Sequence, residues 1–195
     1  MVTRAERRKN LEAKLIETAG RQIAANGLAA VTARSVATEA DIALGSIYSA
    51  FPDLNGLFMA VNLESFEQLA RRVARAILEE EPETPHARLL IMARTYLDFA
   101  MENRNRWKAL FDIEMSRDSD LPELYRNSVA GLLQLIGGPV KEIYPSLPPE
   151  DIDARSRALF SAVHGIVSLG LDARLSAVSE DQMHDMIGFI VENVK

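Results

Sequence analysis

Hydroxyl-bearing side chains gather in one short segment near the N-terminus. The segment reads Leu44, Gly45, Ser46, Ile47, Tyr48 and Ser49. Serine and tyrosine hydroxyls hydrogen-bond phosphate oxygens and base edges when a helix carries them into a DNA groove. The same segment has no Arg, Lys, Asn or Gln, so it lacks the side chains that read a base through two hydrogen bonds. These residues could contact DNA, and the sequence specificity of such contact would depend on an N-terminal arm and on DNA shape.

The apolar residues around this segment have the spacing of two crossed helices. We predict a short helix over residues 34–40, a tight turn over 41–43 and a second short helix over 44–50. The positions expected to touch between these helices are apolar: Val36, Ala37, Ala40, Ile42, Ile47 and Phe51. In a helix-turn-helix the second helix enters the major groove. The pattern therefore predicts a DNA-binding regulator that presents Leu44, Gly45, Ser46, Tyr48 and Ser49 to DNA.

Two of the candidate contacts have a structural alternative. Tyr48 can place its ring on the motif and its hydroxyl on a phosphate, or it can be a buried aromatic that supports the turn. Arg34, at the start of the first short helix, can reach a phosphate or can be a solvated surface base. We favour phosphate contact for Tyr48 and leave both readings open for Arg34.

The N-terminal region is slightly basic although the whole chain is acidic. The 195 residues carry a formal net charge of −6. Residues 1–60 hold seven Lys or Arg and six Asp or Glu, a net charge of +1, whereas the remaining residues carry −7. Four of the bases, including Arg4 and Arg8, lie within the first nine residues. This arm either meets phosphates or is a solvated, disordered terminus, and beside a helix-turn-helix we favour phosphate contact.

Helical spacing of apolar residues continues along the chain, and strand signals are almost absent. Further helices are expected at about 3–25, 53–81, 86–103, 106–115, 122–144, 150–175 and 180–194, with a break or kink at Gly137-Gly138-Pro139. Gly27 suits the chain after the first helix, and Thr32 and Asp53 are expected N-caps. The fold class is all-α. A three-helix helix-turn-helix domain over 1–52 precedes a ligand-binding and dimerisation bundle over 53–195.

Residues for catalysis, metal binding and membrane insertion are missing from the sequence. There is no cysteine, and His86, His164 and His184 have neither metal-ligand spacing nor a recognisable catalytic partner. No phosphate-binding loop and no pair of catalytic carboxylates is found. No apolar run approaches the roughly 18 residues of a membrane span. We therefore expect neither an enzyme nor a cofactor or a metal, and we expect a cytoplasmic protein without membrane contact.

The last two expected helices carry apolar stripes rich in small residues, which permit close helix approach. Two such pairs can form a four-helix interface across a two-fold axis, so we predict a homodimer. The alternative is packing within one chain. The interface candidates are Leu159, Val163, His164, Ile166, Val167, Gly170, Met186, Ile187 and Ile190. For His164, a satisfied core or interface histidine is the default, and a ligand contact is the sharper hypothesis.

With these residues in place, the first 60 residues resemble the TetR-type repressor family. The resemblance rests on Ala19, Gly27, Thr32, Val36, Ala37, Ala40, Ile42, Gly45, Ile47, Tyr48, Phe51 and Leu57. It implies a homodimer on a palindromic operator, released from double-stranded DNA by a small ligand. It also implies that Thr32 touches phosphate and that the positions from Leu44 to Tyr48 meet bases and backbone. The C-terminal half is similar to a subgroup marked by a Trp-His-Gly motif, with Val163 in place of the tryptophan.

Three residues depart from the family pattern near the DNA. Asp41 occupies a turn position that is usually glycine, Ala43 replaces the usual hydroxyl N-cap of the second short helix, and Leu54 replaces a lysine. Aspartate tolerates the left-handed backbone conformation better than most residues, so the turn can form. These departures lower the positive potential, and we expect weaker or more salt-sensitive DNA binding than in a typical member.

The resemblance places a ligand pocket in the C-terminal bundle. The candidates are Phe66, Met92, Tyr96, Phe99, Trp107, Phe111, Met115 and Phe160. Methionine and aromatic side chains make adaptable apolar sites, which suits an apolar or amphipathic effector, although each such residue can equally be ordinary core. The leading hypothesis is a ligand-responsive transcriptional repressor. The alternative is a helical small-molecule-binding or scaffold protein whose degenerate motif no longer reads DNA, and an enzyme ranks last.

Overall fold

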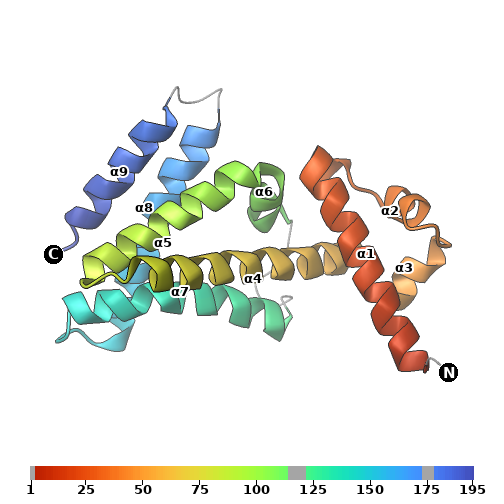
Figure 1. The fold of residues 1–195 in the computed structure, drawn as a ribbon. Helices are drawn as coiled ribbons and strands as arrows, with labels where there is room; N and C mark the ends of the chain where they lie inside the picture. The colour runs from red at the N-terminus through yellow and green to blue at the C-terminus, as the bar shows by residue number, and fades with distance from the viewer. Residues whose placement is uncertain (1–2, 114–121, 173–177) are drawn as a thin grey trace. The chain divides into compact units, whose positions relative to one another are not determined.

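The computed structural model describes residues 3–113, 122–172 and 178–195, and within these ranges the chain is helical with no β-strand. The elements are α1 (Arg4–Asn26), η1 (Leu28–Ala30), α2 (Ala33–Glu39), α3 (Gly45–Ala50), α4 (Leu54–Glu80), α5 (Pro85–Glu102), α6 (Arg104–Asp112), α7 (Glu123–Ile143), α8 (Pro149–Leu171) and α9 (Glu180–Glu192), and the α-helices are labelled in Figure 1. The all-α expectation is confirmed. No helix in the described ranges is long and apolar enough to cross a bilayer.

Backbone contacts group the chain into two compact units. The first comprises Met1–Phe66 and Asn103–Tyr125, and the second comprises Glu67–Glu102 and Arg126–Lys195. Helix α4 is continuous and contributes its first half to one unit and its second half to the other. The first unit therefore contains α6, a segment that lies far from the helix-turn-helix in the sequence.

The first unit is built around α1, which packs against α2, α3 and α6. Its core is formed by buried apolar side chains that recur at helical spacing, which is why these segments fold as amphipathic helices. They are Leu15, Ala19, Ile23, Val31, Val36, Ala37, Ala40, Ile47, Ala50, Leu57, Phe58, Val61, Ala109 and Ile113. The inward faces of α2 and α3 are held on this core, so their outward faces are fixed in orientation.

Side chains cap the helices of this unit at the expected places. The Thr32 hydroxyl accepts a hydrogen bond from the Ser35 backbone N–H at 3.1 Å, and Asp53 Oδ1 accepts one from the Gly56 N–H at 2.7 Å. These bonds satisfy N–H groups that the first helical turn leaves unpaired, and both predicted N-caps are confirmed. After α1, Gly27 has φ +79°, a backbone angle that suits glycine.

Helix α6 is fastened to its neighbours at both ends by amide side chains. Asn105 Nδ2 donates to the carbonyl of Ala24, in the last turn of α1, at 2.9 Å. Asn62 Nδ2, from α4, donates to the carbonyl of Ala109, in the last turn of α6, at 2.8 Å. Carbonyls in a last helical turn have no partner within their own helix, so each amide satisfies a group that would otherwise be orphaned.

In the second unit, α8 packs against α9, and both pack against α5. Helix α7 continues through Gly137, Gly138 and Pro139, so the predicted break is absent, and a kink at these residues stays a prediction. Pro139 has no N–H to donate within the helix, and Pro139 and Val140 are both buried. The expected end of α8 near residue 175 was wrong, because the helix ends at Leu171. The backbone N–H of Asp172, the next residue, donates to the Leu169 carbonyl at 3.2 Å.

Candidate nucleic-acid interface

Helix α3 has one face in the core and the other in solvent. Ile47 and Ala50 are buried, whereas Leu44 is 43% exposed and Tyr48 is 54% exposed. Gly45 is exposed, and a Cβ added to it would meet no atom within 4 Å. The structure therefore brings Leu44, Gly45 and Tyr48 onto the open surface of the second short helix. Tyr48 is therefore not a buried aromatic residue, which was the alternative left open by the sequence.

The hydroxyl groups of the motif are partly engaged within the protein. Ser49 Oγ donates to the Ser46 carbonyl at 2.7 Å, so its proton serves its own helix. Thr32 is exposed while its hydroxyl caps α2, and the side chain of Ser46 is half-buried. The Ser49 proton is therefore already used within the protein, and the large exposed side chains here are those of Leu44 and Tyr48.

The turn before α3 has the strained geometry expected of Asp41, which has φ +51°. The prediction that this aspartate takes a left-handed conformation is confirmed. Helix α3 has Leu44 at its N-cap, so the expectation of Ala43 at this position was wrong, and no side chain accepts a hydrogen bond from its first N–H groups. The short helix is consequently held by packing of Ile47 and Ala50 rather than by capping.

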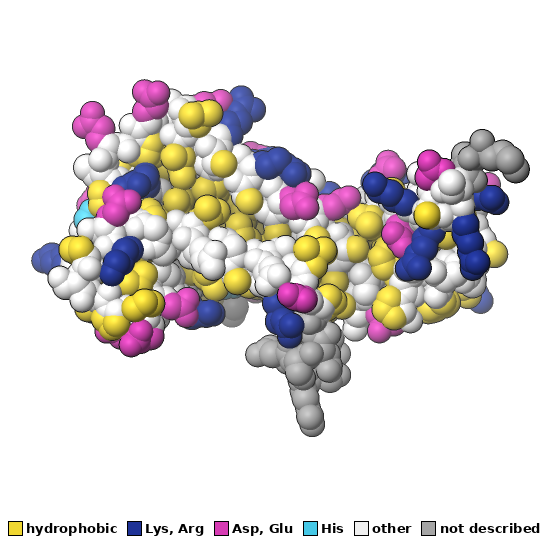
Figure 2. Space-filling model, turned by 90° about the horizontal axis from the view of Figure 1, so that it is seen from below, with side chains coloured by type: hydrophobic (Ala, Val, Ile, Leu, Met, Phe, Trp, Pro, Cys, Tyr) yellow, Lys and Arg dark blue, Asp and Glu magenta, His cyan; other side chains and the backbone are white. Residues whose placement is uncertain are grey.

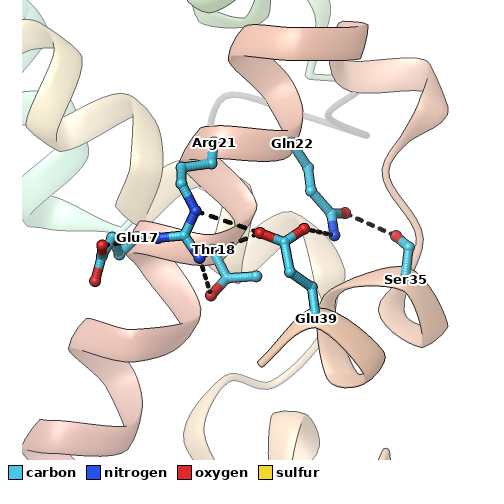
Figure 3. Close-up of polar contacts among 6 residues, drawn as sticks. All are labelled: Glu17, Thr18, Arg21, Gln22, Ser35 and Glu39. Carbon is cyan, nitrogen blue, oxygen red and sulfur yellow. Dashed lines mark hydrogen bonds and ion pairs between the residues drawn. The ribbon is translucent and has the colours of Figure 1, made fainter. Parts of the chain in front are cut away.

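A network of polar side chains joins α2 to α1, and it was not predicted from the sequence. In Figure 3, Arg21 and Gln22 of α1 point towards Glu39 and Ser35 of α2. Gln22 Nε2 donates to Glu39 Oε2 at 2.6 Å, and Ser35 Oγ donates to Gln22 Oε1 at 2.8 Å. Arg21 donates to Glu39 Oε1 at 3.1 Å. We call Arg21, Gln22, Ser35 and Glu39 the α1–α2 clamp.

The clamp has electrostatic consequences for the surface beside α3. The hydrogen bond from Gln22, together with Arg21, lowers the pKa of Glu39 below its ordinary value. Arg21 also pairs with Glu17 at 2.7 Å. Its positive charge is therefore largely balanced within the protein, which leaves less of it for a polyanion. Partners 17 and 18 residues apart have no sequence periodicity, which is why the network was not predicted.

Removing the amide of Gln22 tests whether the clamp stabilises this unit. We expect Gln22→Ala to lower the free energy of unfolding by about 1 kcal/mol, because both ends of the amide bond across the two helices. Glu17→Ala is the matched control on α1, since it removes an exposed pair that stays within one helix, and it should stay within about 0.5 kcal/mol of wild type. Urea unfolding compares them, and equal effects would count against a clamp.

The basic residues predicted to meet phosphate lie on a surface of mixed charge. Arg4 and Arg34 are exposed, whereas Arg8 pairs with Glu12 at 2.8 Å. Over α1–α3 in Figure 2, Lys and Arg side chains are interspersed with acidic ones. Such a surface attracts a polyanion less than a continuous basic patch does, so its affinity for DNA should be lower.

The eight predicted pocket residues are divided between the two units. Phe66, Trp107 and Phe111 belong to the first unit, where Phe66 and Trp107 are buried and Phe111 is exposed. Met92, Tyr96, Phe99 and Phe160 belong to the second, and Met115 lies outside the described residues. Phe66 packs edge-on against Tyr125 with ring centroids 5.4 Å apart, a contact the sequence did not suggest. Their role in ligand binding stays a prediction.

Within the second unit, Tyr96 and His164 form a hydrogen-bonded aromatic pair. The Tyr96 hydroxyl and His164 Nδ1 are 2.8 Å apart, and the ring of Phe160 stacks on His164 with centroids 5.7 Å apart. The pair joins α5 to α8. Burial beside these rings lowers the pKa of His164 below its ordinary value, so the folded chain favours the neutral imidazole.

This lowered pKa predicts a pH-dependent stability. Because the unfolded chain binds a proton more readily than folded His164, the free energy of unfolding should be highest above the ordinary histidine pKa, about 6.5. It should fall as the pH drops through that value towards the folded pKa. Urea titrations between pH 7.5 and 5 should show a shallower fall for His164→Gln. Tyr96→Phe should keep the wild-type slope, since it leaves the burial in place. An unchanged slope in His164→Gln would contradict the assignment.

The predicted dimer residues occupy two different environments on α8 and α9. Val163, Val167 and Ile187 are buried within the chain, where they join α8 to α9. Leu159, His164, Ile166, Gly170 and Ile190 are partly exposed, and Met186 is 43% exposed. Two exposed apolar residues were missed, Leu169 and Phe189, the latter 66% exposed. Phe189 follows Met186 by three residues, so helical spacing could have indicated it.

No group of His, Cys, Asp or Glu in the described ranges has the arrangement of a metal site.

Two family models match the chain. The model for bacterial regulatory proteins of the tetR family matches residues 15–61, and the model for the C-terminal domain of tetracyclin repressor-like proteins matches residues 89–193. No curated protein sequence matches this chain.

Solved structures share the fold at low sequence identity. A protein of unknown function from Rhodococcus sp. RHA1 is 19% identical, with a TM-score of 0.74 over 94% of this chain and 93% of that one. RolR in complex with resorcinol is 19% identical, with a TM-score of 0.71 over 97% and 89%. The multidrug binding protein EbrR, complexed with imidazole, is 22% identical, with a TM-score of 0.61 over 91% and 88%. At this identity the likeness shows the fold.

Proposed function

Because this chain belongs to the TetR family of bacterial regulatory proteins, we propose that it is a ligand-responsive repressor that binds a palindromic operator as a homodimer. The observation that carries the proposal is α3, whose inner face is fixed in the core while Leu44 and Tyr48 are held in the open. We propose that residues 1–52 read DNA, that residues 53–195 bind the effector and dimerise, and that the protein works in the cytoplasm, where bacterial DNA is found. No catalytic step is assigned.

Contacts with phosphate are proposed for the exposed hydrogen-bonding groups around α3. Arg4, Arg34 and the hydroxyl of Tyr48 are exposed and can reach the backbone on either side of a groove. Arg8 and Thr32 are exposed as well, although each already makes a bond within the protein. Backbone contacts of this kind position a helix without reading sequence.

The effector is proposed to be a small apolar or amphipathic molecule with an aromatic ring. The support is the group formed by Tyr96, Phe160 and His164, which combines apolar rings with a polar hydrogen-bonded edge. Two proteins of the same fold were crystallised with small ring compounds, resorcinol in RolR and imidazole in EbrR. The dimer is proposed to form through the exposed apolar residues Leu169, Met186 and Phe189.

Selection of genomic fragments by the purified protein, at low and moderate salt, tests the proposal. We expect recovery of a palindromic site that is retained at both salt concentrations, with affinity falling as salt rises. Sedimentation at micromolar concentration should show a dimer. Recovery of no preferred fragment at low salt would overturn the regulator and favour a helical small-molecule-binding protein with a degenerate motif.

A further inference from the structure

Helix α3 exposes two large apolar side chains although it has only six residues. Leu44, at the N-cap, is 43% exposed and Tyr48 is 54% exposed, whereas Ile47 and Ala50 of the same helix are buried. The exposed part of the Leu44 side chain is apolar and makes no hydrogen bond to water. A leucine in this place has its apolar surface available to whatever binds α3.

The spacing of the two side chains matches the scale of neighbouring base pairs. Residues four apart lie on the same helical face, about 6 Å apart along the axis. Successive base pairs of DNA are about 3.4 Å apart. Leu44 and Tyr48 therefore span one to two base steps if α3 lies in a major groove. The exposed Gly45 between them has no side chain to hold that face away from the bases.

The chemistry of this face restricts what it can read. Every base edge in the major groove offers hydrogen-bond donors or acceptors, and only thymine adds an apolar group, its 5-methyl. Leu44 has no donor or acceptor, and the proton of the Ser49 hydroxyl is already given to the Ser46 carbonyl at 2.7 Å. The feature that Leu44 can recognise is therefore the thymine methyl.

We propose that Leu44, with the ring of Tyr48 beside it, determines operator specificity by contacting thymine methyl groups. This inference rests on the proposed function, because it assumes that α3 enters the major groove. It assigns to an apolar contact the discrimination that other recognition helices obtain from paired hydrogen bonds. The operator half-site is expected to hold thymine at one or two positions under α3.

Replacing single thymines of the recovered operator by deoxyuridine tests the proposal, because the exchange deletes the methyl and leaves every hydrogen-bonding group in place. Loss of one buried methyl should raise the Kd about fourfold. We expect this effect at one or two positions in each half-site. The Leu44→Ala variant should bind thymine and deoxyuridine operators equally at the position that Leu44 contacts. Tyr48→Phe is the matched control, since it keeps the ring and should keep the discrimination.

The possible results distinguish a failure of thymine methyl recognition from a failure of the proposed function. A preferred fragment that binds equally well with deoxyuridine at every position would overturn methyl recognition and leave the regulator standing. Continued methyl discrimination by Leu44→Ala at all positions would overturn the role of Leu44. Absence of any preferred fragment would overturn both the proposed function and this inference. Because Leu44 is exposed, we expect the Leu44→Ala variant to fold, and thermal unfolding followed by circular dichroism checks this.

Discussion

Gly170→Ala is expected to lower the free energy of unfolding by about 1–3 kcal/mol, because α8 and α9 approach too closely at this point to admit a methyl group. A Cβ on Gly170 would lie 2.1 Å from Met183 Sδ and 2.9 Å from its Cγ. Met183 is flexible but buried, so it cannot swing into solvent to make room. The packing of α8 on α9 must then open, and urea unfolding measures the loss.

Gly165→Ala is the matched control for that prediction. It lies on the same helix, and its added Cβ would meet nothing within 4 Å. Alanine is the better helix former by up to about 1 kcal/mol, so this variant should be as stable as wild type or more stable. If the two variants shifted stability in the same direction by the same amount, the close approach at Gly170 would be refuted.

Asn62→Ala is expected to cost about 1–3 kcal/mol, since it leaves the Ala109 carbonyl buried at the end of α6 without its donor. Asn62 is almost fully buried, so no solvent can replace the lost bond at the surface. Its own Oδ1 has no hydrogen-bond partner among the described residues, and removing that oxygen offsets part of the cost. Chemical denaturation of the two proteins gives the difference.

Ser65→Ala is the matched control for Asn62→Ala. It alters a buried polar residue of α4 and leaves the hydrogen bond to the Ala109 carbonyl in place. Ser65 is buried on the same helix, three residues from Asn62. Its hydroxyl donates to the Val61 carbonyl at 3.3 Å, one turn back along the helix. The Val61 carbonyl also accepts a backbone hydrogen bond within α4, so the alanine variant leaves no carbonyl unpaired. We expect the free energy of unfolding to fall by less than about 0.5 kcal/mol. A loss as large as that of Asn62→Ala would contradict the capping role.

Local signals in the sequence predicted the helices and several of their caps. Thr32 and Asp53 cap helices because their side chains reach the third N–H beyond them, an interaction set by adjacent residues. Asp41 takes a positive φ for an equally local reason. The break predicted at Pro139 is absent, and the burial of this residue is not revealed by its neighbours in the sequence.

Partners distant in the chain could not be predicted. Gln22 and Glu39 are ordinary polar residues of two amphipathic helices, and only the folded arrangement makes them a pair. Trp107 and Phe160 had the same aromatic character in the sequence, yet they belong to different compact units. For the candidate interface, the motif fixed which residues face outwards, and the structure added that Leu44 is open while the Ser49 proton is occupied.

The two side-chain hydrogen bonds at the ends of α6 limit which segments of this protein can be exchanged with those of its relatives. Asn105 holds the carbonyl of Ala24 in α1, and Asn62 holds the carbonyl of Ala109 in α6. The unit that carries the helix-turn-helix is thus made from two separate stretches of chain. A chimera with a single crossover would replace one partner of these bonds and keep the other. Exchange of operator specificity between family members therefore needs either a graft confined to α3 or the joint transfer of both stretches.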